Sequence, residues 1–140
     1  MKKIFVDANI VIDLFDMASK DHTVAEHCFR IIRLHFGLPV VSPITFVITN
    51  YLLGKFVKNK QWHKRQMQLG FSQMEITSLQ PSYIDQVFKS NFTDLEDGLQ
   101  YQCALHAKAA LIITKDISDY FDSKIPVVHP QDFVLRYNNL

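Results

Sequence analysis

Short apolar runs alternate along this sequence with longer segments of helical periodicity, and this alternation constrains the fold more than any other feature. The runs are rich in β-branched and aromatic residues, and they occupy residues 4–6, 38–41, 75–79, 111–114 and 125–128. An apolar run without polar alternation is typical of a strand buried on both faces. Helices between consecutive strands favour parallel pairing, because a parallel connection needs a crossover. The sequence therefore predicts an α/β fold, a three-layer α/β/α sandwich with a five-stranded, mostly parallel sheet.

Helix start signals stand at two positions that matter for the argument below. Ser42 and Pro43 predict a helix start, because a capping hydroxyl precedes a proline whose missing N–H costs nothing at the first helical position. Thr93 or Asp94 can cap a second helix, which we expect over residues 95–107. Both helices follow or precede a predicted strand, as the α/β pattern requires.

The composition fits one compact domain. The chain has 140 residues, of which 48% are hydrophobic and 21% charged, a profile far from that of a disordered protein. We therefore expect a single domain over residues 1–140. A formal net charge of +1 excludes a polycation that holds nucleic acid by bulk charge alone. Two separated cysteines, no signal-peptide pattern and no apolar run of about 18 residues lead us to expect a cytoplasmic protein without a membrane segment.

Acidic residues follow the first and fourth predicted strands and begin the helix between them. Asp7 comes directly after the first strand, and Asp116 and Asp119 come after the fourth. Asp94 and Asp97 are three residues apart, so they share one helix face. The carboxyl ends of parallel strands line the ligand crevice of such a sheet. We therefore expect these acids to converge on one site.

A shared site of this kind needs a compensating positive charge. Each acid taken alone has an ordinary explanation as a strand end, a helix N-terminus or a turn. Together they would repel one another, since two carboxylates about 4 Å apart cost about 4 kcal/mol at an effective dielectric of about 20. Protons shared through raised pKa values or a hard divalent cation would relieve the repulsion, and an all-oxygen site suits Mg²⁺ or Mn²⁺. We favour the metal, which implies phosphoester hydrolysis by an activated water.

Basic residues gather in one stretch of the chain. Lys55, Lys58, Lys64 and Arg65 lie there, around Trp62 and His63. The stretch fits either a solvated helix face or an arm that contacts phosphates. Lys115, next to Asp116, likewise fits either a solvated lysine or a contact to a substrate phosphate.

Five segments together resemble the PIN-domain family, which includes the VapC-like metal-dependent ribonucleases. They are IFVDANIVID, PITFVITNYLL, DLEDGLQYQCA, LIITKDISDYF and IPVVHPQDF, in the order and spacing of the family. The resemblance implies the sheet order 3-2-1-4-5 and makes Asp7, Asp97 and Asp116 catalytic, metal-binding acids. It makes Asp119 a further metal-binding acid, and it gives Asn9 and Thr114 supporting roles.

The same resemblance implies a function and a set of partners. It suggests an endoribonuclease that hydrolyses RNA phosphodiester bonds with Mg²⁺ or Mn²⁺, the toxin of a toxin–antitoxin pair. RNA, an antitoxin protein and a second copy of the chain in a homodimer are the implied partners. The basic stretch and Lys115 would then bind the substrate backbone.

One position departs from the pattern of the family. The second acid of the family, commonly a glutamate in the helix after the second strand, falls at about Asn50, a neutral and weaker ligand. Glu96 could replace it, although helical geometry turns Glu96 about 100° away from Asp97. A missing charge at this point weakens metal binding and activity.

Two other functions therefore stay open at this point. A non-catalytic binding or scaffold module on the same fold is favoured by Asn50. A haloacid-dehalogenase-like phosphatase would also use acids after the first and a later strand. Its general acid would fall on Asn9, which does not donate a proton as a carboxylic acid does.

Overall fold

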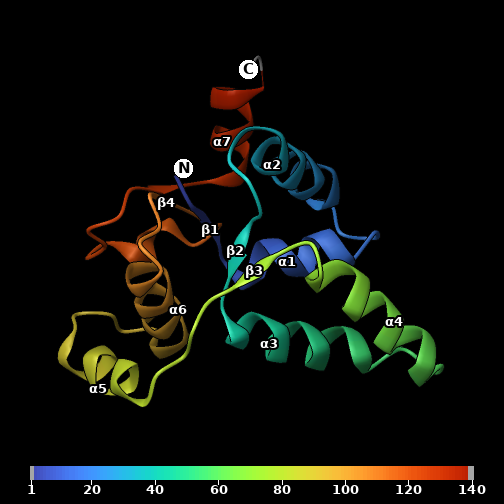
Figure 1. Cartoon of the computed structure of the whole chain (residues 1–140), viewed down its shortest axis with the longest axis horizontal. Coiled ribbons are helices and arrows are strands. Elements are labelled where there is room, and N and C mark those ends of the chain that lie inside the picture. The colour runs from blue at the N-terminus through green and yellow to red at the C-terminus, as the bar shows by residue number, and fades with distance from the viewer. Residues whose placement is uncertain (1, 139–140) are drawn as a thin grey trace.

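The strands form one parallel sheet in a computed structural model that describes residues 2–138 (Figure 1). They are β1 (Ile4–Val6), β2 (Val40–Val41), β3 (Glu75–Ile76), β4 (Leu111–Ile113) and β5 (Val127–Val128). The order across the sheet is β3-β2-β1-β4-β5, and each neighbouring pair is parallel. This confirms the predicted α/β fold and strand order. It also makes β1 and β4 neighbours, so that the residues after them, Asp7 and Asp116, leave the same edge.

The connections between strands are helical. The helices are α1 (Ala8–Phe15), α2 (His22–His35), α3 (Pro43–Gly54), α4 (Lys60–Phe71), α5 (Pro81–Lys89), α6 (Leu95–His106) and α7 (Pro130–Tyr137), and a 3-10 turn, η1, covers Ile117–Tyr120. No helix among residues 2–138 is long and apolar enough to cross a membrane. The helix α1 was not foreseen, because its sequence ANIVIDLF is apolar almost throughout and carries no capping hydrogen bond from the side chain of Asp7. The strand β1 has the predicted bounds, whereas β2 to β5 are shorter than the apolar runs that predicted them.

The sheet separates two apolar cores, because successive side chains of a strand point to opposite faces. Ile4 and Val6 of β1 pack with apolar residues of α1, α2, α4 and α7, whereas Phe5 packs with those of α5 and α6. Figure 1 shows α5 and α6 on one side of the sheet and α1 and α2 on the other. The chain is thus layered as α/β/α, as the sequence predicted.

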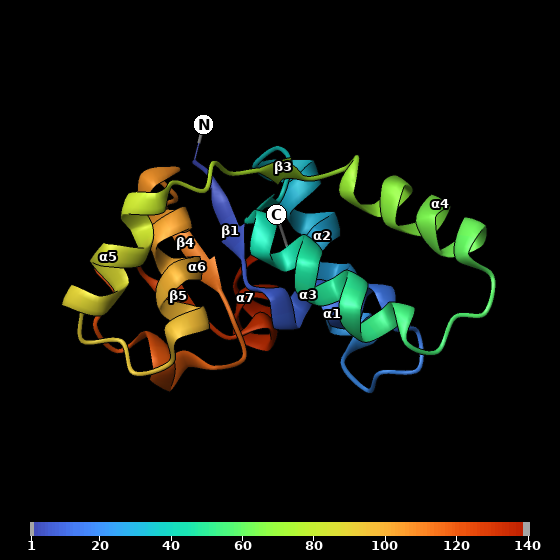
Figure 2. The same cartoon turned by 90° about the horizontal axis from the view of Figure 1, so that it is seen from below.

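A buried polar contact joins α3 to α6 beside the carboxyl edge of the sheet. Ser42 caps α3, accepting from the Thr45 backbone N–H. The Ser42 hydroxyl donates to Gln100 Oε1 at 2.5 Å, and Gln100 Nε2 donates to Thr45 Oγ1 at 3.1 Å. All three side chains have no exposed surface. The contact fixes the first turn of α3 against the helix that carries Asp97. Figure 2 shows α3 and α4 joined by a loop at the end of the molecule farthest from α5.

Candidate metal centre

Three carboxylates from three separate elements meet at the carboxyl edge of the sheet. Asp7 follows β1, Asp116 follows β4, and Asp97 lies in the first turn of α6. Each offers one oxygen, and these oxygens all lie within 4.8 Å of one another. Asp7 is 2% exposed and Asp97 is 5% exposed, whereas Asp116 is open to solvent. The structure therefore brings together the three acids that the sequence placed at one site.

Asp7 is held by hydroxyl groups from the neighbouring strand and turn. Its Oδ2 accepts from Thr114 Oγ1 at 2.7 Å and from the Tyr120 hydroxyl at 3.2 Å. Burial raises the pKa of Asp7 to about 6, and these hydrogen bonds oppose the rise. Tyr120 was missed in the sequence, because only the 3-10 turn η1 brings it back toward β1.

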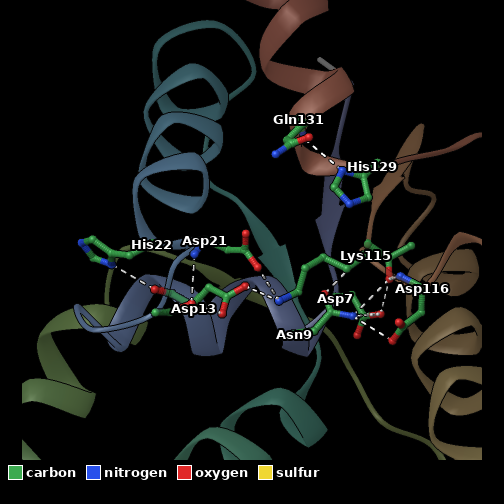
Figure 3. Close-up of polar contacts among 11 residues, drawn as sticks. Asp7, Asn9, Asp13, Asp21, His22, Lys115, Asp116, His129 and Gln131 are labelled. Atoms are coloured by element: carbon green, nitrogen blue, oxygen red, sulfur yellow. Dashed lines mark hydrogen bonds and ion pairs between the residues drawn. The ribbon is translucent and has the colours of Figure 1, made fainter.

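Asn9 bridges the first and last acids of the cluster (Figure 3). Its Nδ2 donates to Asp116 Oδ2 at 3.1 Å and to Asp7 Oδ2 at 3.4 Å, and its Oδ1 accepts from the Lys115 backbone N–H at 3.4 Å. The Thr114 hydroxyl in turn accepts from the Asp116 backbone N–H at 3.0 Å. Asn9 and Thr114 therefore both contact the acids of the cluster.

The N-cap residue of α6, Asp94, fixes the backbone at Asp97. Asp94 Oδ1 accepts from the Asp97 backbone N–H at 3.0 Å, so the first turn of α6 starts where the sequence predicted. Burial raises the pKa of Asp97 to about 8, with further contributions from the charges of Asp7 and Asp94 and from a hydrogen bond to Asp119. Asp119 belongs to a second group of close acids, formed with Asp94 and Asp97.

Burial is the main cause of these raised pKa values, and among residues 2–138 no lysine, arginine or histidine forms an ion pair with Asp7, Asp97 or Asp116. A divalent cation is the compensation that the donor set fits, because carboxylate oxygens are hard ligands. Asp7, Asp97 and Asp116 are the residues whose oxygens could hold it together.

Comparison with known proteins agrees with the fold. A family model described as a PIN domain matches residues 3–118 of the chain. The chain belongs to the PIN-domain family. Ribonuclease VapC1 from Aquifex aeolicus (strain VF5) is 27% identical over 144 residues, which cover 99% of this chain and 98% of that protein.

Solved PIN-like structures superpose on most of the chain. VapC20 of Mycobacterium tuberculosis, a toxin that cleaves the sarcin-ricin loop, has a TM-score of 0.66 at 12% identity and covers 85% of this chain and 95% of its own. VapBC2 of Rickettsia felis, bound to a DNA fragment from their promoter, has a TM-score of 0.66 at 14% identity, covering 90% and 97%. FitAB bound to the IR36 DNA fragment has a TM-score of 0.64 at 16% identity, covering 91% and 94%. At these identities the likeness concerns the fold.

Asn50 lies outside the pocket around Asp7, Asp97 and Asp116. Its Oδ1 is 2.9 Å from His63 Nε2, on the side of α3 that faces α4. The residues of α3 that line the pocket around Asp7, Asp97 and Asp116 are apolar or aromatic: Val47, Ile48, Tyr51 and Leu52. The structure therefore does not bring Asn50 into the pocket that the acids line. The helical register, which the sequence alone left uncertain by one or two residues, turns Asn50 away.

Glu96 does face the pocket, contrary to the expected orientation. It lines the same pocket as Asp7, Asp97 and Asp116. Burial and the charges of Asp94 and Asp116 raise the pKa of Glu96. In the first turn of a helix a long side chain can reach across the helix end, so the angle of about 100° between neighbouring residues did not decide its direction.

The expected substrate-binding residues are spread over a wider surface than the pocket. Lys55, Lys58, Lys64 and Arg65 are exposed at the end of α3, in the loop after it and on α4. The Lys55 ammonium lies 4.3 Å from the centre of the Tyr51 ring, which lines the acidic pocket. Lys64 and Arg65 lie in the second turn of α4, away from that pocket.

Lys115 is partly buried and is directed away from the acid cluster. Its Nζ lies 2.6 Å from Asp13 Oδ2 and 3.3 Å from Asp21 Oδ2. Figure 3 shows the side chain running from the end of β4 toward these two acids, away from Asp116. Both sequence-based alternatives for Lys115 missed this pairing, because nothing in the sequence indicated that α1 brings Asp13 close to the end of β4.

Proposed function

We propose that this PIN domain is a metal-dependent endoribonuclease that hydrolyses RNA phosphodiester bonds. The observation that supports it most strongly is the meeting of Asp7, Asp97 and Asp116, with their oxygens within 4.8 Å. The similarity to Ribonuclease VapC1 over nearly the whole of both chains supports the substrate class. The all-oxygen donor set favours Mg²⁺ or Mn²⁺.

In this proposal some residues of the site bind the cation, and others orient the residues that bind it. A bound divalent cation supplies two effects, a lower pKa of water and stabilisation of the charge that develops on the phosphate. Thr114 and Tyr120 keep Asp7 oriented and favour its ionised form, and Asn9 sets the spacing between Asp7 and Asp116. Glu96 is the fourth carboxylate at the pocket, and its raised pKa suits it to accept a proton from water.

Partners follow from the same family relationship. We propose that the chain acts as the toxin of a toxin–antitoxin pair. Among the proteins with the same fold, VapC20 is a toxin. VapBC2 is bound to a DNA fragment from the promoter of VapBC2, and FitAB is bound to the IR36 DNA fragment. A homodimer and a location in the cytoplasm belong to the same proposal. The basic residues Lys55, Lys58, Lys64 and Arg65 would bind the RNA backbone without reading its sequence.

A divalent-ion titration tests the metal site directly. Wild type, Asp97→Asn and the control Asp85→Asn, which changes an exposed acid on α5, are melted at increasing Mn²⁺ or Mg²⁺. We expect a metal-dependent rise in melting temperature in wild type and control but not in Asp97→Asn. RNA cleavage should likewise be present in the wild type and in Asp85→Asn and absent in Asp97→Asn. The absence of any rise in the wild type would refute the proposal.

A non-catalytic module on the same fold is the second candidate. It is favoured by the apolar wall of α3, which adds no carboxylate to the pocket. It predicts that Asp7→Asn and Asp97→Asn leave stability equal or better, with no activity to lose. The phosphatase alternative is disfavoured, because the chain belongs to the PIN-domain family and Asn9 forms hydrogen bonds with Asp7, Asp116 and Lys115.

A further inference from the structure

The segment that carries Asp116 is held at one residue, Lys115, by both its main chain and its side chain. The Lys115 backbone N–H donates to Asn9 Oδ1 at 3.4 Å. Its ammonium pairs with Asp13 at 2.6 Å and with Asp21 at 3.3 Å. The strand end is thereby tied to α1 and to the residue before α2.

The acids that hold Lys115 are themselves fixed. Asp13 is 7% exposed, and its second oxygen, Oδ1, accepts from the Ser19 hydroxyl at 2.9 Å. The same hydroxyl accepts from the Asp21 backbone N–H at 3.1 Å, and His22 Nδ1 lies 2.9 Å from the Asp13 carbonyl oxygen. The turn between α1 and α2 therefore folds around Asp13, and Lys115 pairs with a preformed anchor.

Asp116 is the member of the acid cluster that most needs such an anchor. Asp7 is buried and bound by two hydroxyls, and Asp97 is buried behind its helix cap. Asp116 is exposed, follows a strand rather than lying in a helix, and faces two carboxylates of the same charge. Repulsion from the other two carboxylates would move the Asp116 side chain away from them unless the backbone on either side of Asp116 is restrained.

We propose that Lys115 is a positioning residue, which holds Asp116 in the metal-binding arrangement through its ion pairs with Asp13 and Asp21. This inference rests on the proposed function for its catalytic consequence. The restraint on the backbone between Thr114 and Asp116 does not depend on metal or RNA. Residues that hold a metal ligand in place without binding the metal themselves orient that ligand, and their loss weakens metal binding by roughly 10- to 100-fold.

The test compares Lys115→Met with Lys115→Arg and with the matched control Lys3→Met. The control removes an exposed ion pair, Lys3 to Glu75 at 2.8 Å, at the opposite end of β1. Four quantities are measured: hydrogen exchange of the Asp116 backbone N–H, the Mn²⁺ concentration at half-maximal rise in melting temperature, kcat on RNA and KM on RNA. If Lys115→Met does not fold, the same quantities are measured for Asp21→Asn, which breaks only the longer ion pair, that between Lys115 and Asp21.

We expect Lys115→Met to speed exchange at Asp116 and to raise the required Mn²⁺ by roughly 10-fold or more. It should lower kcat with KM changed by less than about 2-fold, because a positioning residue does not touch the substrate. Lys115→Arg should recover most of each effect, and Lys3→Met should show none. Lys115→Met combined with Asp13→Asn should be no worse than Lys115→Met alone, since Lys115→Met already breaks the pair with Asp13.

Two results would overturn the inference. A raised KM with an unchanged Mn²⁺ response would mean that Lys115 contacts RNA. Equal exchange at Asp116 in Lys115→Met, Lys3→Met and wild type would mean that the ion pairs restrain nothing at the site. Hydrogen exchange at Asp116 needs neither metal nor RNA, so it tests the inference even if the wild type has no nuclease activity. In that case, faster exchange in Lys115→Met would support the positioning role of Lys115, and the proposed nuclease function alone would fail.

Discussion

Asp7 and Asp97 show how burial turns ordinary carboxylates into groups with unusual proton affinity. Both are nearly inaccessible to solvent, and burial is the main cause of their raised pKa values of about 6 and about 8. Asp97 is raised more because the charges of Asp7 and Asp94 add to burial, whereas Asp7 receives hydrogen bonds that favour its charged form. Both acids therefore hold a proton more tightly than an exposed carboxylic acid does.

The metal-free protein should therefore lose stability as the pH rises. The folded-state pKa of Asp97 exceeds its unfolded value of 3.8, so the folded state binds more protons between about pH 4 and pH 8. Stability is highest below this window and falls through it, by at most about 1.4 kcal/mol per pH unit for each group. Thermal melts in chelator from pH 5 to 8 should show the decline. Asp97→Asn should flatten it above about pH 6, where Asp7 has already titrated; an equal slope in both proteins would contradict the assignment.

Tyr120 should stabilise the charged form of Asp7. Its hydroxyl, on a side chain 2% exposed, donates to Asp7 Oδ2 at 3.2 Å. Tyr120→Phe should lower the free energy of unfolding by about 1.5 to 3 kcal/mol at pH 8 and by less at pH 5, where Asp7 is protonated. Denaturant unfolding at the two pH values measures the difference. Tyr51→Phe, which changes a phenol 62% exposed, is the control and should cost nothing at either pH.

At the scale of elements, the sequence was sufficient for what depends on local pattern. The strand positions, the Ser42 cap of α3 and the Asp94 cap of α6 follow from apolar runs and capping residues, and the structure has them. Which face of a helix meets the pocket depends on packing between elements. For this reason the sequence did not predict that Glu96 lines the pocket and Asn50 does not, although both lie in correctly predicted helices.

The apolar wall of α3 leads to a prediction about this element. Ile48 lines the pocket with the acids, so Ile48→Glu adds a carboxylate from a fourth direction. We expect the metal-free melting temperature to fall through added repulsion and the affinity for Mn²⁺ to increase, because one more hard ligand faces the ion. Calorimetric titration with Mn²⁺ measures the affinity. Ile84→Glu, which places a glutamate on the exposed face of α5, is the control, and equal affinities in the two variants would show that α3 lies too far from the ion.

At the scale of the whole molecule, charge is separated although the net charge is only +1. The acids gather at the carboxyl edge of the sheet, and exposed basic residues lie at the end of α3 and along α4. Composition could not show this separation, since opposite charges cancel in the sum. A negatively charged polymer could then contact the basic surface while one of its phosphates approaches the acids, provided that a cation lies between them.

The salt dependence of RNA binding tests this arrangement. If Lys64 and Arg65 each contact one backbone phosphate, Lys64→Gln and Arg65→Gln should each reduce the slope of log K against log salt by about 1. Cleavage at saturating RNA should not change, because neither residue lies at the acidic pocket. Binding is measured over a series of salt concentrations, with Asp97→Asn as background to prevent cleavage. Lys89→Gln, an exposed lysine on α5, is the matched control; a slope equal to that of the control would show that α4 is a solvated face that does not meet RNA.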